Sequence, residues 1–211
     1  MPADEHQTLT RALLMAGMLA CAAFYAIVLL QIAIDASFSI REHPISLLAL
    51  GPNGWMQATN FTLTGLLFAA GAFGIFRDGR FRAASFLIVL AAIGLLAVAI
   101  FPADPFKGYP PGSSAVDPTE ISDHAKLHGL GFMLIFGGIF LAAIAVIIAA
   151  WRSESTALKV VTLLALLAIP LCLAIGFSSE ELNSEAFVVV GLFGFGWVSY
   201  LCWWLQHTRS E

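Results

Sequence analysis

The chain has 211 residues, of which 59% are hydrophobic and only 11% are charged. A soluble domain has about 25% charged residues, so a composition this apolar along the whole length indicates a protein whose solvent is lipid. The net charge of −4 comes without a basic stripe or a surplus of Lys and Arg, which excludes a nucleic-acid-binding surface. The expected partners are therefore membrane lipids and other membrane protein subunits, with no nucleic acid.

Six uncharged apolar runs follow one another along the chain. A helix rises about 1.5 Å per residue and needs about 20 residues to cross the bilayer core, with about 17–25 tolerated. The runs cover residues 12–34, 55–76, 83–101, 129–151, 160–177 and 186–206. We therefore predict an all-α integral membrane bundle of six transmembrane helices, forming a single domain over residues 1–211.

The charged loops predict an orientation. The first run is too long for the apolar part of a cleavable signal, so we expect a retained membrane anchor. With the N-terminus in the cytoplasm, the inner side carries seven cations and the outer side three, which is a positive-inside bias. The inner cations are Arg11, Arg77, Arg80, Arg82, Arg152, Lys159 and Arg209, and the outer ones are Arg41, Lys107 and Lys126. Both termini are therefore predicted to be cytoplasmic, with outer loops at about 35–54, 102–128 and 178–185.

The second run, WMQATNFTLTGLLFAAGAFGIF, is unusual for its polar side chains. Gln57, Asn60 and Thr64 recur at i, i+3 and i+7, so they share one face of a helix. Exposing amides to lipid is costly, so this face should turn towards the bundle. Two interpretations remain open, namely hydrogen bonding between helices or the wall of a polar cavity, in which Gln57 and Asn60 bind a ligand.

The stretch FPADPFKGYPPGSSAVDPTEISDHAKLHG, residues 101–129, gathers polar residues between two apolar runs. Pro102 and Pro105 end the third helix and hold Asp104 just outside it. Thr119 or Ser122 is the expected N-cap of the fourth helix.

His124 and His128 lie one turn apart on the same face of that helix. Their spacing allows both imidazoles to hold one metal ion, with His43 from the first outer loop as a third ligand. Zinc would lower the pKa of a bound water to about 7, and Asp104 would orient that water or act as its base. Asp123 is a further candidate ligand-binding residue. The alternatives are a structural hydrogen-bonding role for the histidine pair, for instance with Asp104, ligand binding without metal, and for His43 an exposed loop position before Pro44.

The stretches HPISLLALGPNGWMQATNFTLTGLL and FPADPFKGYPPG…HAKLHG resemble the bacterial family catalogued as domain of unknown function 998. The resemblance covers roughly residues 40–135 and implies a multi-pass protein of the bacterial inner membrane, without an implied reaction. It highlights Ser46, Gly51, Gly54, Trp55, Asn60, Gly65, Asp104, Gly108, Pro110, His124 and His128. Leu47 and Leu48 stand where many relatives have an acidic residue, and Gly129 stands where relatives often have Asp.

Ser39 four residues before His43, followed by an Asp and an HxxxH pair, is similar to the residue set of the membrane hydrolases that include alkaline ceramidases and adiponectin receptors. This looser resemblance implies a zinc-dependent hydrolase of a lipid or amphiphile, with Ser39 as a catalytic residue. Those proteins carry the HxxxH on the last of seven helices, whereas here it lies on the fourth. Two other functions are weighed: a non-catalytic subunit whose outer loops clasp a partner or each other, and a small transporter using the polar face of the second run.

Overall fold

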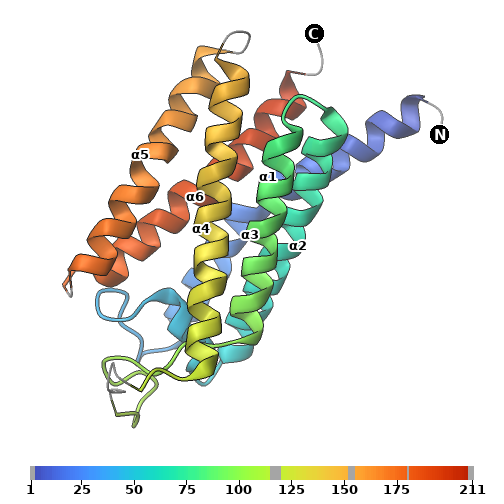
Figure 1. The fold of residues 1–211 in the computed structure, drawn as a ribbon. Helices are drawn as coiled ribbons and strands as arrows, with labels where there is room; N and C mark the ends of the chain where they lie inside the picture. Colours follow the sequence, from blue (N-terminus) through green and yellow to red (C-terminus); the bar gives the residue numbers. More distant parts are fainter. Residues whose placement is uncertain (1–2, 115–119, 152–154, 180, 209–211) are drawn as a thin grey trace.

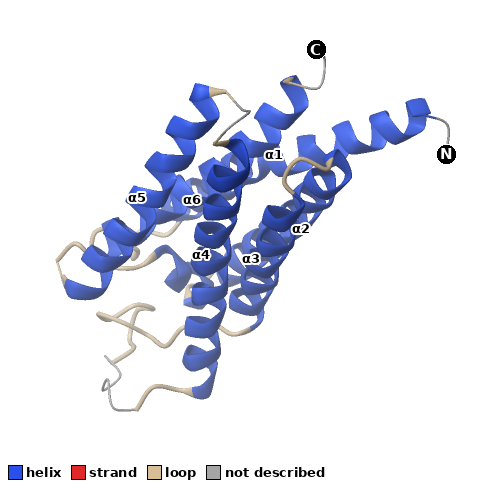
Figure 2. Ribbon diagram, turned by 45° about the horizontal axis from the view of Figure 1, so that its top comes forward, coloured by secondary structure: helices blue, strands red, loops and turns tan. Residues whose placement is uncertain are grey.

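The computed structural model describes residues 3–114, 120–151, 155–179 and 181–208. Within these ranges the chain forms helices joined by loops, and no strand is present (Figure 2). The elements are α1 (Ala3–Ile34), the 3-10 helix η1 (Ile45–Leu50), α2 (Gly54–Asp78), α3 (Arg82–Ile100), α4 (Asp123–Ala150), α5 (Thr156–Ser178) and α6 (Asn183–His207). All six α-helices are long and apolar enough to cross a membrane, which confirms the predicted membrane bundle.

The helices extend past the apolar runs because polar residues form their first and last turns. At the start of α4, the Ser122 hydroxyl accepts a hydrogen bond from the Ala125 backbone N–H at 3.1 Å, so Ser122 is the N-cap. Thr119, the other candidate, lies outside the described residues, as do Arg152 and Arg209. The cap lets α4 begin at Asp123, so His124 and His128 both lie on it.

Consecutive helices pack side by side, and α6 returns to pack against α1 (Figure 1). The start of α1, the α2–α3 turn and the end of α6 lie at one end of the bundle, at the top of the figure. The connection that contains η1 and the long loop before α4 lie at the opposite end, which we call the loop end. The candidate polar residues of both loops therefore lie at the same end of the molecule.

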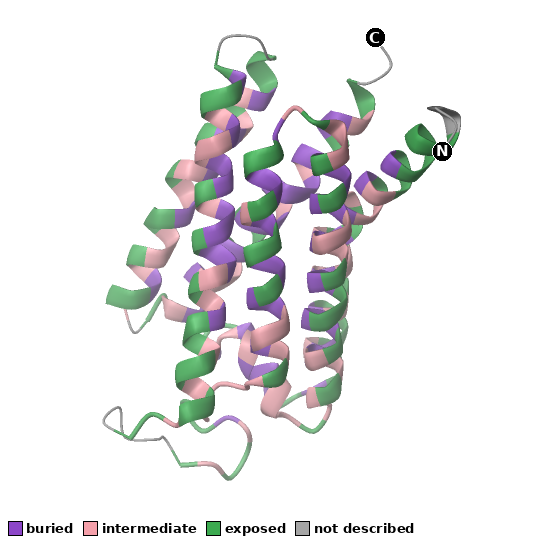
Figure 3. Ribbon diagram, turned by 45° about the vertical axis from the view of Figure 1, so that its right-hand side comes forward, coloured by how far each residue is buried: buried purple, intermediate pink, exposed green. Residues whose placement is uncertain are grey.

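Buried residues face the centre of the bundle and exposed residues face outward (Figure 3). Helices α1 and α2 approach each other closely, since a Cβ atom on Gly71 would lie 2.9 Å from the Gly17 Cα atom. Small residues allow membrane helices to meet backbone to backbone. The seam between α1 and α2 is therefore closed at this depth.

Hydrogen bonds hold α6 to both of its neighbours. The Tyr25 hydroxyl of α1 donates to the Val188 carbonyl at 2.6 Å. On the other side, the Trp197 indole N–H donates to the Thr162 hydroxyl of α5 at 3.2 Å. Because these groups find partners inside the bundle, α6 keeps a fixed position beside the pocket described below.

Candidate functional site

The polar face of α2 turns inward, as its spacing predicts. Gln57, Asn60 and Thr64 are fully buried. The Asn60 amide N–H donates to the Phe24 carbonyl of α1 at 3.0 Å and to the Gln57 side-chain oxygen at 3.3 Å. One atom of each side chain, namely Gln57 Nε2, Asn60 Oδ1 and Thr64 Oγ1, has no hydrogen-bond partner among the described residues. The contact to Phe24 is the kind of interhelical bond expected here, and a ligand-binding role for Gln57 and Asn60 stays a prediction.

A buried hydrogen-bonded pair joins the loop after α1 to the loop before α4 at the loop end. Asp35, just after α1, is buried, and so is Tyr109 from the loop before α4. The Tyr109 hydroxyl donates to Asp35 Oδ2 at 2.7 Å, while the Ser37 backbone N–H donates to Asp35 Oδ1 at 3.0 Å. A Cβ atom on Gly51 would lie 1.9 Å from the Tyr109 hydroxyl oxygen. Only glycine leaves room for the pair at that position.

The same contacts shift the acidity of both partners. Burial raises the pKa of Asp35, but the hydrogen bonds from Ser37 and Tyr109 favour the carboxylate and hold the pKa below its usual range. Burial, and then the hydrogen bond to Asp35, raise the pKa of Tyr109. At neutral pH the pair is therefore a carboxylate accepting a hydrogen bond from a neutral phenol.

His43 adds a second link between the loops. Its Nδ1 atom accepts the Ser39 backbone N–H at 3.1 Å, so the ring proton lies on Nε2, which donates to the Lys107 carbonyl at 3.3 Å. Lys107 and Gly108 both have positive φ, at 49° and 77°, and form the tight turn that presents this carbonyl. The ring also lies 5.1 Å from the Tyr109 ring, centroid to centroid. Both nitrogens of His43 are engaged within the loops. We call Asp35, Ser39, His43, Lys107 and Tyr109 the loop clasp.

The remaining predicted polar residues have separate partners. Asp104 Oδ2 accepts the Ser122 backbone N–H at 2.9 Å and so ties the loop to the first turn of α4. Asp123 is exposed and forms an ion pair with Lys126 at 2.8 Å. His124 is exposed, with its ring 5.6 Å from that of Phe101.

The three histidines proposed as zinc ligands do not come together. Within the described parts of the chain, no group of three His, Cys, Asp or Glu side chains is arranged to hold one metal ion. His43 lies in the loop clasp, His124 faces outward and His128 turns towards the bundle. The zinc site formed by these histidines therefore stays a prediction, which metal analysis tests.

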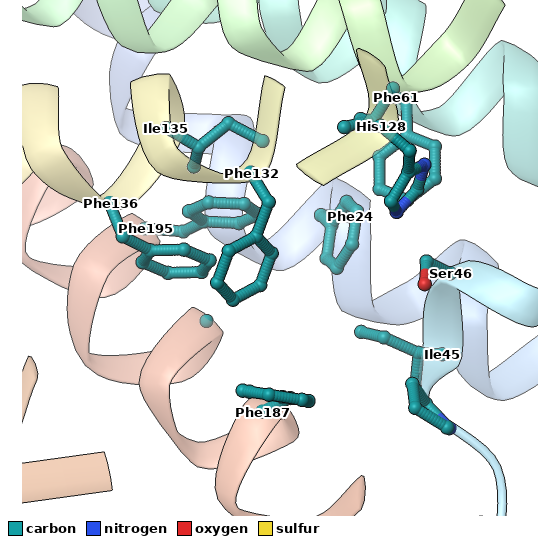
Figure 4. Close-up of a pocket in the computed structure, with 13 residues that line it drawn as sticks. Phe24, Ile45, Ser46, Phe61, His128, Phe132, Ile135, Phe136, Phe187 and Phe195 are labelled. Carbon is teal, nitrogen blue, oxygen red and sulfur yellow. The ribbon is translucent and has the colours of Figure 1, made fainter. Parts of the chain in front are cut away.

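A partly open pocket lies at the loop end, between α4, α6 and η1 (Figure 4). It encloses a cavity of about 60 Å³ and opens to the outside at its rim. Most of the lining is aromatic, with rings contributed by α1, α2, α4 and α6: Phe24, Phe61, Phe132, Phe136, Phe187 and Phe195. No Asp, Glu, Lys or Arg is among the described residues that line it. The pocket is therefore suited to an apolar ligand or to the apolar part of a larger one.

Two polar side chains, His128 and Ser46, also line the pocket. His128 Nδ1 lies 2.9 Å from the Phe101 carbonyl, which only accepts, so Nδ1 carries the proton and Nε2 is an acceptor in the neutral ring. Neither His128 Nε2 nor the Ser46 hydroxyl has a hydrogen-bond partner among the described residues. These two groups are therefore able to bond to a ligand, unlike those of the loop clasp.

Reasoning from the sequence missed both Asp35–Tyr109 and the pocket. An Asp directly after an apolar run, with a Tyr in another loop of the same end, is nevertheless a usable signal for a buried hydrogen-bonded pair. The phenylalanines gave no signal, because aromatic residues inside apolar runs are ordinary membrane-helix residues. Of the six in the lining, Phe132 and Phe136 follow His128 at i+4 and i+8 on α4, and this spacing is visible in the sequence.

Comparison with known proteins gives one match. None of the curated proteins compared, and none of the solved structures compared, is similar to this chain. The sequence pattern of one family, described as Protein of unknown function (DUF998), matches residues 18–205, which include the second half of α1, all of α2 to α5, most of α6 and both loops of the clasp. The earlier resemblance over residues 40–135 thus extends through all six membrane helices, and the chain belongs to the DUF998 family of proteins of unknown function.

Proposed function

We propose that this membrane protein binds a single-chain amphiphile in the phenylalanine-lined pocket, with the ligand's polar group at the loop end beside His128 and Ser46. The observation that carries the proposal is the distribution of chemistry in the lining. Ligand sites are mostly apolar with a few placed polar groups. This pocket has apolar walls and two polar side chains with free hydrogen-bonding capacity.

The axial order of the lining residues supports an amphiphile over a uniformly apolar ligand. His128, Phe132 and Phe136 lie on one face of α4 at i, i+4 and i+8. At about 1.5 Å per residue, Phe136 lies about 12 Å deeper in the bundle than His128. A ligand that follows this face meets an imidazole first and aromatic rings further in, which matches a head group followed by a chain.

Binding without metal is favoured over zinc-dependent hydrolysis for a specific reason. Zinc ligation needs neutral imidazole nitrogens with free lone pairs, and the Nδ1 lone pair of His43 already accepts a backbone N–H while its Nε2 carries the proton. Asp104 is committed to the first turn of α4. Two of the residues inferred for hydrolysis, His43 and Asp104, therefore have roles in holding the loops.

Charge distribution supports a site on the extracytoplasmic side. The described cations of the α2–α3 turn, namely Arg77, Arg80 and Arg82, lie at the end of the bundle opposite the loop end (Figure 1). Positive charge near short loops favours the cytoplasmic side. We accordingly place both termini in the cytoplasm of a bacterial inner membrane and the pocket towards the outer leaflet, an assignment that reporter fusions to either terminus test.

Photolabelling tests the proposed binding. The protein is reconstituted in nanodiscs with a diazirine-bearing fatty alcohol, irradiated and mapped by mass spectrometry. Lipid-facing Leu167 and Leu171 of α5, both exposed, report labelling by probe dissolved in the bilayer. We expect labelling of Phe132 and Phe136 to exceed that of α5 and to fall when unlabelled alcohol competes.

A pocket-blocking variant gives the matched control. Ser46→Phe places a ring in the pocket lining, whereas Thr59→Phe adds the same ring at an exposed position of α2. The first variant should lose the excess labelling and the second should keep it, with thermal unfolding showing that both fold. Equal labelling of pocket and α5 in the wild type rejects the proposed function.

A further inference from the structure

The two free polar groups of the pocket differ in what they offer a ligand. His128 Nε2 is an acceptor, because the ring proton is held on Nδ1 by the Phe101 carbonyl at 2.9 Å. The Ser46 hydroxyl both donates and accepts. Figure 4 shows the two side chains on the same side of the pocket, while Phe132, Phe136 and Phe187 lie away from them. The polar end of the pocket therefore combines an obligate acceptor with an adaptable hydroxyl.

The pocket also lacks a counter-charge for an ionic head group. None of its described lining residues is Lys or Arg, so a carboxylate, sulfonate or phosphate would be buried with one hydroxyl donor at most. The nearest cationic side chain along α4, Lys126, is exposed and paired with Asp123. Burying an unpaired charge costs far more than burying a neutral polar group. Anionic head groups are thus disfavoured twice, by the missing cation and by the acceptor that faces them.

We infer that the pocket selects a neutral head group that donates a hydrogen bond, an alcohol rather than an anion, with His128 Nε2 as the acceptor that determines this specificity. The inference rests on the proposed function, since it assumes that an amphiphile occupies the pocket. It adds which chemical class is bound and which residue discriminates. His128 and Ser46 then act as the recognition pair, and the phenylalanines accept any apolar chain of suitable length.

Three probes with one diazirine-bearing alkyl chain separate donor ability from charge. An alcohol donates and accepts, its methyl ether only accepts, and a sulfonate stays anionic. Labelling is measured in nanodiscs at pH 8, where imidazole is neutral, and is normalised to Leu167 and Leu171 of α5 to correct for membrane partitioning. The alcohol should label Phe132 and Phe136 roughly two- to tenfold more than the ether, the range expected from one hydrogen bond. The sulfonate should label them least.

Two histidine variants test whether His128 causes the preference for the alcohol. His128→Phe removes the acceptor and should reduce alcohol labelling to the level of the ether, leaving the ether unchanged. His124→Phe makes the same change at the exposed imidazole one turn earlier and should keep the preference for the alcohol. If His128→Phe does not fold, the comparison of the three probes on the wild type still tests whether the pocket prefers a neutral head group that donates a hydrogen bond.

The outcomes separate the two proposals. Equal labelling by alcohol and ether, or stronger labelling by the sulfonate, overturns the head-group inference while leaving amphiphile binding intact. Pocket labelling no higher than that of α5 with all three probes overturns the proposed function itself.

Discussion

The loop clasp and the pocket lie at the same end of the bundle but use their polar side chains in opposite ways. In the clasp, the Tyr109–Asp35 hydrogen bond and the bond from His43 to the Lys107 carbonyl join two loops. His43 has a partner at both ring nitrogens. At the pocket, His128 Nδ1 bonds to the Phe101 carbonyl, whereas His128 Nε2 and the Ser46 hydroxyl have no partner among the described residues. A polar cluster at a membrane surface is thus no evidence of a site until its internal hydrogen bonds have been assigned.

The same contrast separates the two helix seams. Between α1 and α2, glycine backbones meet and Asn60 bonds across to Phe24. Between α4 and α6, rings such as Phe132 and Phe187, 5.3 Å apart, keep the helices separated. Small residues and one hydrogen bond from a side-chain amide close the α1–α2 seam, whereas aromatic rings keep the α4–α6 seam wide enough for a pocket. Variants of the α1–α2 seam and of the loop clasp should show whether these two regions stabilise the fold, and metal analysis should show whether the loop end holds zinc.

The largest effect is expected from Gly71→Leu in the closed seam. A side chain there meets the backbone of Gly17, which has no flexible end to move aside. Overpacking a tight interior typically costs about 1–3 kcal/mol, and we expect at least the upper end of this range. Unfolding in mixed micelles measures it. Gly137→Leu is the control, because nothing lies within 4 Å of a Cβ atom at that exposed position of α4, and equal losses in both variants would contradict the closed seam.

Tyr109→Phe should have the next largest effect, because it leaves one oxygen of the buried Asp35 carboxylate without its donor. Hydrogen bonds to charged groups contribute about 1.5–3 kcal/mol, so we expect a loss of about 2 kcal/mol at neutral pH. Tyr200→Phe is the control, because the Tyr200 hydroxyl has no hydrogen bond to the described residues. Similar losses in the two variants would show that the clasp does not stabilise the loops.

The pH dependence of the same variant sharpens the test. Because the pKa of Asp35 is lowered in the folded protein, the contribution of Asp35 to folding stability is complete above its unfolded-state pKa of about 3.9. This contribution is lost as pH falls through the folded-state pKa. Because the pKa of Tyr109 is raised in the folded protein, the contribution of Tyr109 to folding stability is complete below its unfolded-state pKa of about 10. This contribution is lost as pH rises through the folded-state pKa. The difference between wild type and Tyr109→Phe should stay constant from about pH 5 to 9 and shrink on both sides.

Asn60→Leu should have a smaller effect. It removes the bond to the Phe24 carbonyl but also removes a buried amide oxygen that has no partner among the described residues. Hydrogen bonds between membrane helices contribute about 0.6 kcal/mol on average and up to about 1.7, so we expect a loss of about 1 kcal/mol. Thr62→Leu, at an exposed position whose hydroxyl bonds within its own helix, should be neutral. A gain in stability from Asn60→Leu would indicate that the polar face serves a ligand at the expense of packing.

The six helices and the inward face of α2 follow from the sequence because both depend on local periodicity. Runs of about 20 apolar residues and polar residues at i, i+3 and i+7 have one arrangement that satisfies the backbone and the amides in lipid. Ser122 was likewise one of two cap candidates, because capping chemistry is local. These features need no knowledge of how distant segments meet.

The clasp and the pocket could not be predicted because they depend on long-range contacts. Asp35 and Tyr109 are 74 residues apart, and His43 is 64 residues from Lys107. The i, i+4 spacing predicted that His124 and His128 act together, yet only His128 is covered, by the end of α3 through Phe101. Spacing along one helix does not specify which neighbour packs against each residue.

Zinc content should show the smallest effect. Because the ring nitrogens of His43 are engaged and no three described acidic, Cys or His residues are grouped for a metal, we expect purified protein to carry far less than one zinc per chain. His124→Ala combined with His128→Ala should leave that value unchanged, as measured by elemental analysis after exchange into metal-free buffer. One zinc per chain that disappears in the double variant would show that the loop end rearranges to bring its histidines together, and hydrolysis would then replace binding as the function to test.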